Sequence, residues 1–260
     1  MPDDAPPSKD TQIPTNLRLL VLLEEVARLG EAVRPTDLIE SMGLPKPTIH
    51  RLLQTAEAEG FLQRDLDGRS YGPGDRLRAM AVNTMSSERL RTARLAIMKG
   101  AAEEIGETIN LATPDREGMT YLDRVETKWP LRIQLPIGTQ VPFHCTASGK
   151  MYLSSLRSTT LNGVLNAKPL EKLTEQTITD PEVLRKELAE ARRRGFTQDN
   201  EEFMTGMAAI AVPILDPQNR LLATLSVHAP VMRCSLEQII GFLEPLQMAA
   251  AKLSDLNRNQ

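Results

Sequence analysis

Three short amphipathic patterns between residues 16 and 60 restrict the fold of this chain more than any other feature. The first has apolar residues at the i, i+3, i+4, i+7 spacing of a helix, namely Leu19, Leu22, Leu23 and Val26. The second follows Pro35 and ends at Gly43, a residue suited to a left-handed helix cap. The third starts at Pro45, which a first helical turn tolerates, and stops at Gly60. Such short connections predict three helices packed together.

A hairpin is predicted directly after the third helix. Residues 61–64 and 69–71 flank Asp67 and Gly68, and an Asp-Gly pair favours a tight turn because its central residues need positive φ. Three helices and a hairpin define a winged helix-turn-helix domain over residues 15–74. The Pro-rich segment 1–14 before it is expected to be a disordered tail.

The rest of the chain divides at Gly106. Residues 75–105 contain no proline and are expected to form a linker helix, continuous or in two pieces. Its part from 76 to 100 carries six basic residues against one acidic residue. Residues 106–258 mix strands and helices without a regular βαβ order, which predicts an α+β domain. We expect strands at 108–113, 119–125, 131–135, 207–215 and 221–228, and helices at 147–156, 181–194 and 235–256.

Composition excludes several classes of protein. The apolar run Met207–Leu215 is broken by Pro213 and is too short to cross a bilayer, and the N-terminus has no apolar signal-peptide core. Two cysteines, Cys145 and Cys234, rule out a disulfide framework. We therefore expect a soluble cytoplasmic protein with no membrane association.

The third helix is a candidate reader of duplex DNA. Its first turns would present hydrogen-bond donors to a major groove, with arginines on the hairpin near the adjacent backbone. The candidate residues are Lys46, Thr48, His50, Arg51, Gln54, Arg64 and Arg69.

An alternative for this domain is protein docking or dimerisation without DNA binding. Residues 1–75 carry 8 basic and 13 acidic side chains, which weakens any general attraction to phosphates. Much of that acid lies in the tail and the first helix. On the alternative reading the protein would be a docking adaptor or a ligand sensor.

Longer motifs point to a family. The segment from Thr36 through Gly43 to Leu53 resembles the reader domain of IclR-type transcriptional regulators. Residues 142–150 (PFHCTASGK), 195–202 (GFTQDNEE), 207–216 and 225–230 resemble the second domain of that family in order and spacing. Leu215 departs from the family pattern, which prefers an aromatic residue or His there.

The resemblance implies a GAF-like effector-binding domain, operator DNA as a partner, and a homodimer or dimer of dimers. It implies a transcriptional repressor or activator of a catabolic operon that responds to a small organic acid. By position the effector residues would be Ala147, Ser148, Asp199, Ala209, Ser226 and His228. Many members carry Cys at position 209 and Ser at 228, so the ligand should differ from the short keto-acids that some members bind.

Elementary chemistry agrees with a pocket there. A helix starting at Ala147 would offer backbone N–H groups to an anion, and Ser148 and Ser226 would add hydroxyls. His228 would donate a hydrogen bond in either protonation state, and Asp199 would contact the ligand or hold its own loop.

Other chemistries are not expected. The adjacent His144 and Cys145, with His228 and Cys234, do not have the spacing of a zinc site. Paired catalytic carboxylates, a phosphate loop and a catalytic triad do not appear in the sequence. We therefore predict no metal, no cofactor and no enzymatic activity.

Overall fold

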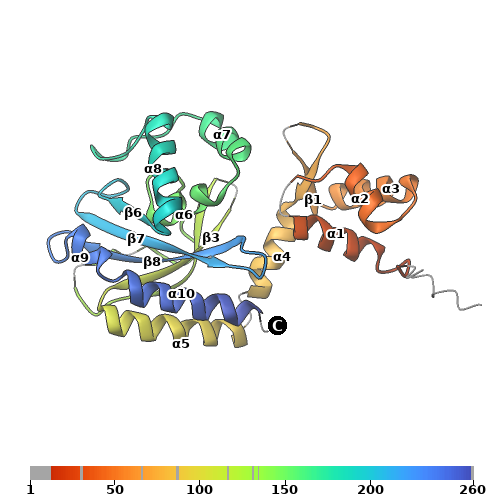
Figure 1. The fold of residues 1–260 in the computed structure, drawn as a ribbon. Helices are drawn as coiled ribbons and strands as arrows, with labels where there is room; N and C mark the ends of the chain where they lie inside the picture. Colours follow the sequence, from red (N-terminus) through yellow and green to blue (C-terminus); the bar gives the residue numbers. More distant parts are fainter. Residues whose placement is uncertain are drawn as a thin grey trace, which may run out of the picture. The chain divides into compact units, whose positions relative to one another are not determined.

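The computed structural model describes residues 13–29, 32–65, 67–85, 88–115, 117–130, 132–133 and 135–258. The chain forms two compact units, Met1–Ser87 and Glu88–Gln260, which are described separately (Figure 1). None of the helices in the described ranges is both long enough and apolar enough to cross a bilayer. The predicted tail over 1–14 lies outside those ranges except for residues 13 and 14.

The first unit is a winged helix-turn-helix, as predicted. Its elements are α1 Arg18–Leu29, α2 Pro35–Met42, α3 Lys46–Ala58, β1 Leu62–Arg64, β2 Tyr71–Pro73 and α4 Asp75–Met85. Gly43 ends α2 with φ of 62°, and its N–H bonds to the carbonyl of Ile39. Pro45 is the N-cap of α3 rather than its first residue, and Pro47 occupies the first turn.

One apolar core holds this unit together. The buried stripe of α1 packs against Leu38 of α2 and against Ile49 and Leu53 of α3. The hairpin closes the core through Leu62 and Tyr71. A backbone bridge between Val33 and Tyr71, with two 2.8 Å hydrogen bonds, adds a third short segment to the wing that the sequence pattern did not predict.

The second unit is built on one antiparallel sheet of order β5-β4-β3-β8-β7-β6. The strands are β3 Thr108–Pro114, β4 Gly118–Val125, β5 Gln140–Pro142, β6 Thr197–Asn200, β7 Met207–Leu215 and β8 Leu221–Pro230. The helices are α5 Glu88–Ile105, α6 Ala147–Ser155, α7 Ser158–Ala167, α8 Pro181–Arg194, α9 Leu236–Ile240 and α10 Leu243–Arg258. Together they confirm the predicted α+β class.

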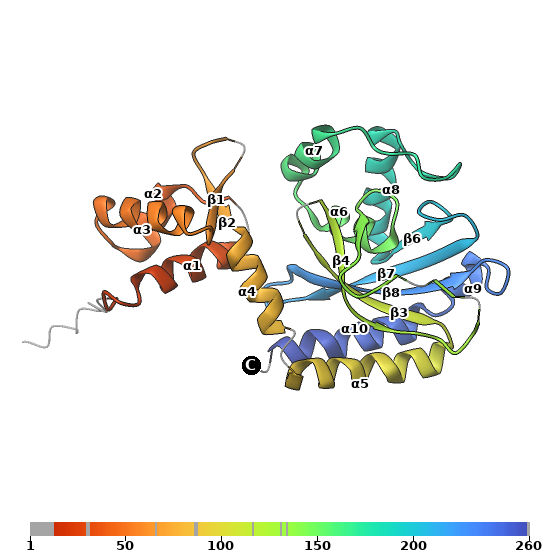
Figure 2. The same cartoon turned by 180° about the vertical axis from the view of Figure 1, so that it is seen from behind.

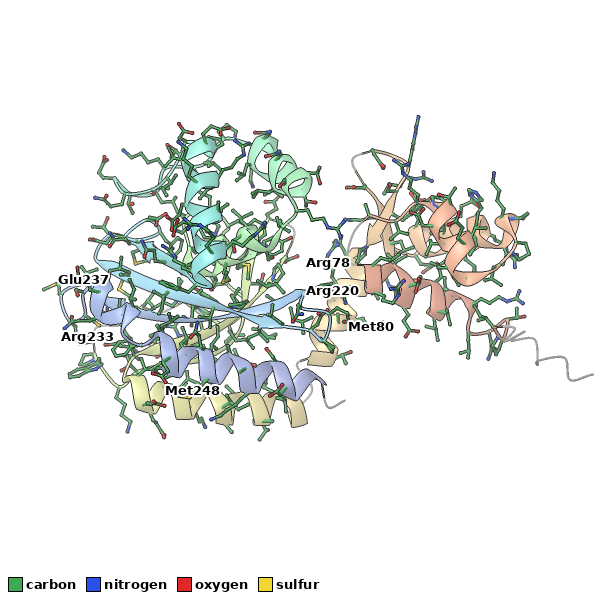
Figure 3. The ribbon with its side chains drawn as sticks, viewed as in Figure 1. Arg78, Met80, Arg220, Arg233, Glu237 and Met248 are labelled. Carbon is green, nitrogen blue, oxygen red and sulfur yellow. The ribbon has the colours of Figure 1, made fainter. Side chains whose placement is uncertain are left out.

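Helices cover both faces of this sheet (Figures 1 and 2). Helices α5 and α10 lie side by side on one face, while α6 packs on the other face and α8 packs on α6. Ion pairs connect α5 and the segments at its end to the sheet. Asp123 of β4 is fully buried between Arg91 and Arg94 of α5, with N–O distances of 2.9 and 2.5 Å. Arg233, labelled in Figure 3, lies where β8 leads into α9. Its guanidinium makes a two-point pair with Glu107 at 2.6 and 2.7 Å.

Some elements differ from the sequence-based expectation. Strands β5 and β6 and helix α7 were not predicted, and the closing helix is divided into α9 and α10, with Ser235 capping α9 as expected. Residues 131 and 134 of the predicted strand at 131–135 lie outside the described residues, and 132, 133 and 135 have no regular structure. The segment 75–105 consists of α4 in the first unit and α5 in the second.

Candidate DNA-reading helix and effector site

The polar side of α3 is exposed. Lys46, His50, Arg51 and Gln54 are open to solvent, and Thr48 is half-buried. Ile49, Leu53 and Ala56 on the opposite side are buried, and this burial fixes which side faces outward. Two acidic residues, Glu57 and Glu59, lie at the C-terminal end of α3. The exposed side therefore offers donors near the helix N-terminus, the geometry in which recognition helices contact base edges.

The two wing arginines are in different environments. The guanidinium of Arg64 donates to both carboxylate oxygens of Glu57 at 2.8 and 3.2 Å and lies 4.9 Å from the ring centre of Tyr71. Arg69 is exposed, and its backbone N–H donates to Asp67 Oδ1 at 2.8 Å. Hydrogen bonds from Ser70 and Arg69 lower the pKa of Asp67 to about 2. Of the two arginines, Arg69 has the freer side chain to reach a partner.

The structure gathers all six predicted effector residues under α6. Ala209 on β7 lies opposite both His228 on β8 and Asp199 on β6. Ser226 lies two positions before His228 on the same face, and Ala147 and Ser148 form the first turn of α6, which packs on these strands. All six are buried, with at most 4% of any residue exposed.

Three of these side chains form a chain of hydrogen bonds. Ser148 Oγ donates to Ser226 Oγ at 3.3 Å, and Ser226 Oγ shares a 3.0 Å hydrogen bond with His228 Nε2. Burial, with a smaller effect of the Arg124 charge, lowers the pKa of His228 to about 3. The imidazole is therefore neutral near pH 7 and offers one donor and one acceptor.

Asp199 holds the loop that follows β6. Its Oδ1 accepts hydrogen bonds from the backbone N–H groups of Glu202, at 2.8 Å, and Phe203, at 3.3 Å. Glu202 is paired with the fully buried Lys150 of α6 at 2.5 Å. Burial, reinforced by the neighbouring Glu202 charge, raises the pKa of Asp199 to about 7. These contacts correspond to the loop-holding role considered for Asp199.

The start of α6 is fixed by local contacts. Thr146 is the N-cap, and its Oγ1 accepts from the N–H of Gly149 at 3.0 Å and donates to the carbonyl of Pro142 at 2.7 Å. A Cβ on Gly149 would lie 2.4 Å from the Phe143 backbone, so only glycine allows this approach. The N–H groups of Ala147 and Ser148 have no acceptor within the helix, as in any first turn.

Several buried polar residues beside these six were not predicted from the sequence. They are Asn110, Tyr121, Lys150 and Glu202, together with the half-buried Arg124. Strand periodicity could have found Asn110, because alternation along 108–113 places it on one face with Thr108. Lys150 and Glu202 lay within the quoted motifs, but their pairing joins positions 52 residues apart and becomes visible only in the fold.

A cavity of about 260 Å³ lies elsewhere in this unit, between the β5 region, α6 and α7. His144, Leu153 and Leu165 are among its lining residues, and none of the six predicted effector residues is. His144 Nε2 is hydrogen bonded to the carbonyl of Glu171 at 2.8 Å. This cavity is therefore separate from the residues gathered under α6.

Comparison with known proteins supports the same division of the chain. Residues 17–66 match the model of the IclR helix-turn-helix domain, and residues 82–255 match that of the bacterial transcriptional regulator IclR C-terminal domain. The probable transcriptional regulator SauR of Cupriavidus necator is 36% identical over 91% of this chain and 94% of its own length. The acetate operon repressor of Salmonella typhimurium is 30% identical over 88% of this chain and 84% of its own.

A solved structure gives a further match. A crystal structure of an IclR homologue from Microbacterium hydrocarbonoxydans, complexed with 4-hydroxybenzoate, has a TM-score of 0.61 and 26% identity. The match covers 93% of this chain and 100% of that one. The fold and these matches define the class: a bacterial transcriptional regulator with a helix-turn-helix DNA-binding domain, rather than an enzyme. The chain belongs to the IclR family.

Proposed function

We propose that this regulator controls a catabolic operon and that a small organic acid, bound under α6 in the second unit, modulates its affinity for the operator. The DNA-reading residues in this proposal are Lys46, Thr48, His50, Arg51, Gln54, Arg64 and Arg69. The effector-binding residues are Ala147, Ser148, Asp199, Ala209, Ser226 and His228.

The exposed donors of α3 support the DNA-reading part of the proposal. Arg51 and Lys46 suit guanine edges or phosphates, while His50 and Gln54 suit base edges. Arg69 on the wing adds a backbone contact. Arg64, already held by Glu57, contributes less to binding than Arg69 unless that pair opens on DNA.

The polar cluster under α6 supports the effector part. The first-turn N–H groups of α6 and the macrodipole favour a carboxylate at this end of the helix. The hydroxyls of Ser148 and Ser226 lie beside it and can donate to a carboxylate oxygen. Neutral His228 supplies orientation rather than charge, which fits an acid with a second, uncharged polar group.

Regulation follows from differential binding. An acid that binds one arrangement of a homodimer, or of a dimer of dimers, better than another shifts the population toward it. The segment 75–105 would carry this change to the recognition helices. Half-sites lie about 34 Å apart or at a multiple of that spacing, so a small change in helix spacing prevents both helices from docking.

The observation that carries the proposal is the burial of six separately positioned residues, four of them polar, in one cluster at the N-terminus of α6. The test is a gel shift with the intergenic DNA upstream of the protein's own gene, at about 50 and 200 mM salt, with and without small organic acids. We expect specific, salt-sensitive retardation that an acid changes. Complete lack of specific retardation would favour the docking adaptor.

A further inference from the structure

Asn110 carries a buried side-chain amide. The residue lies in the middle of β3 with 0% of its surface exposed. Within the described part of the chain, neither its Oδ1 nor its Nδ2 has a hydrogen-bond partner. Burying an amide without hydrogen bonds is costly, and nearly all buried polar groups in native proteins are paired. We therefore looked for the partner that Asn110 is placed to meet.

The sheet register places Asn110 in the cluster under α6. Asn110 lies directly opposite Ser226 of β8 on one side and Arg124 of β4 on the other. Directly opposite residues point to the same face of a sheet, so the amide shares the face of Ser226 and His228. The ring of Tyr121 meets the ring of His228 edge-on at 6.4 Å on this face.

The neighbouring polar groups are already engaged. The hydroxyl of Ser226 interacts with Ser148 and with His228. Both terminal nitrogens of Arg124 donate to backbone carbonyls, those of Ile133 and Leu135. Its Nε lies 3.2 Å from a carboxylate oxygen of Glu126 but makes no hydrogen bond within the described residues. Turning the Ser226 hydroxyl or the terminal nitrogens of Arg124 toward Asn110 would break a hydrogen bond that each already makes.

The chemistry of a carboxamide defines its partner. Oδ1 only accepts and Nδ2 only donates, so one group that satisfies both must itself accept and donate. A hydroxyl does this. A ketone or a carboxylate would pair with Nδ2 and leave Oδ1 unpaired, and a carboxylate would also repel Oδ1.

We infer that Asn110 is a specificity-determining residue of the effector site and that the effector is a hydroxy acid, with its hydroxyl on Asn110 and its carboxylate at the start of α6. The inference rests on the proposed function, because it takes that site as given. Ser226 connects the two ends: it lies beside Asn110 and is hydrogen bonded to Ser148 of α6. Asn110 therefore reads the part of the ligand that distinguishes one small acid from another.

The test compares matched pairs of acids that differ by one hydroxyl: glycolate and acetate, lactate and propionate, 4-hydroxybenzoate and benzoate. Binding of each acid to the full-length protein is measured by calorimetry. For at least one pair we expect the hydroxy acid to bind about 10- to 100-fold more tightly, because its analogue leaves the amide unpaired. Equal binding of both members in every pair that binds would overturn the inference.

Variants localise the effect. Asn110→Leu has similar volume and no polar group, and we expect it to reduce the preference to about one while leaving the melting temperature unchanged or higher. Asn166→Leu, an exposed position in α7, is the matched control and should keep the full preference. A preference that survives in Asn110→Leu would overturn the inference.

The outcomes separate this inference from the proposed function. If no acid of either kind binds the wild-type protein, the proposed function fails, and the inference fails with it. If acids bind but the hydroxyl makes no difference, the inference alone fails. The wild-type comparison requires no variant, so it decides the matter even if Asn110→Leu does not fold.

Discussion

Ser148 Oγ, in the first turn of α6, donates a 3.3 Å hydrogen bond to Ser226 Oγ in the middle of β8. This bond joins the end of the helix where backbone donors are available to the central strands of the sheet. A ligand at that end of α6 must share or replace it. If the proposed effector site is correct, the position of α6 determines what the second unit can bind.

The close approach of α6 to the preceding segment predicts a strong effect of Gly149→Ala. The new Cβ would meet the Phe143 backbone at 2.4 Å, and backbone cannot move as a side chain can. We expect a loss of unfolding free energy of about 1–3 kcal/mol or more, measured by urea denaturation. Gly163→Ala in α7 is the control: its Cβ meets nothing within 4 Å, and it should stabilise by roughly 0.5–1 kcal/mol. Equal effects would contradict this reading of α6.

The buried pair of Lys150 and Glu202 predicts a pH-dependent defect. Lys150→Met leaves a buried carboxylate without its cation, at a cost of roughly 3–5 kcal/mol near neutral pH. Burial already raises the pKa of Glu202, so the defect should shrink at low pH, where that carboxyl is protonated. The double variant Lys150→Met/Glu202→Gln should recover much of the loss. If the double variant is as unstable as the single one, the pair is not the cause.

The raised pKa of Asp199 predicts how the free energy of unfolding changes with pH. Its pKa is raised to about 7, whereas it is ordinary in the unfolded chain, so folding takes up a proton between about pH 4 and 7. The contribution of this group to stability therefore falls as pH rises through that window. Asp199→Asn keeps the Oδ1 acceptor for Glu202 and Phe203 but does not titrate.

Relative to the wild type, Asp199→Asn should gain about 2–3 kcal/mol in unfolding free energy between pH 5 and pH 8. Urea titrations at the two pH values measure this difference. An Asp199→Asn advantage that is the same at pH 5 and pH 8 would show that the carboxyl is not a proton-binding group of the folded state.

The exposed face of α3 predicts separable DNA and ligand defects. Arg51→Ala should weaken operator binding by about 5- to 150-fold, corresponding to the loss of one base or phosphate contact, and leave ligand binding intact. Fluorescence anisotropy with labelled operator DNA measures the first quantity, and calorimetry measures the second. Arg193→Ala in α8 removes another exposed arginine, from the second unit, and should change neither. Retained operator affinity would remove Arg51 from the reading surface.

His228→Ala tests the opposite combination. Its imidazole is buried in the cluster under α6, so the change should alter the concentration of effector needed for a response and leave ligand-free operator affinity unchanged. The measurement is a dose–response curve of effector on the operator complex. An unaltered curve would place His228 outside the effector site.

Much of the fold was predictable because local signals agreed with tertiary packing. In the first unit, helical spacing, the Gly43 cap and the Asp-Gly turn each specify the same arrangement. Strands β7 and β8 were predictable because they are long and apolar around a turn at Asp216–Asn219. Gly68 has φ of 64°, as a hairpin turn requires, although the turn extends from Asp65 to Ser70.

The missed elements lack such signals. β6, with the sequence TQDN, is a strand because Thr197 and Asp199 are buried by pairing with β7 and by α6, not because of its composition. α7 contains Gly163 and two adjacent threonines, which are weak helix formers, and it is held by packing of Leu165 in the core. The cluster of residues under α6 was predicted only in part, because Asn110 contacts Ser226 across 116 residues of sequence.

The most direct test of the central claim is the affinity of the protein for labelled operator DNA, measured by anisotropy at fixed salt while an acid that binds the second unit is added. Coupling between the two sites should change the apparent Kd for operator DNA by about 5- to 150-fold. This change should saturate over the acid concentrations that fill the acid site of the free protein, once the coupling is included in the calculation. An operator Kd that stays constant while calorimetry shows the acid site filled would contradict the account.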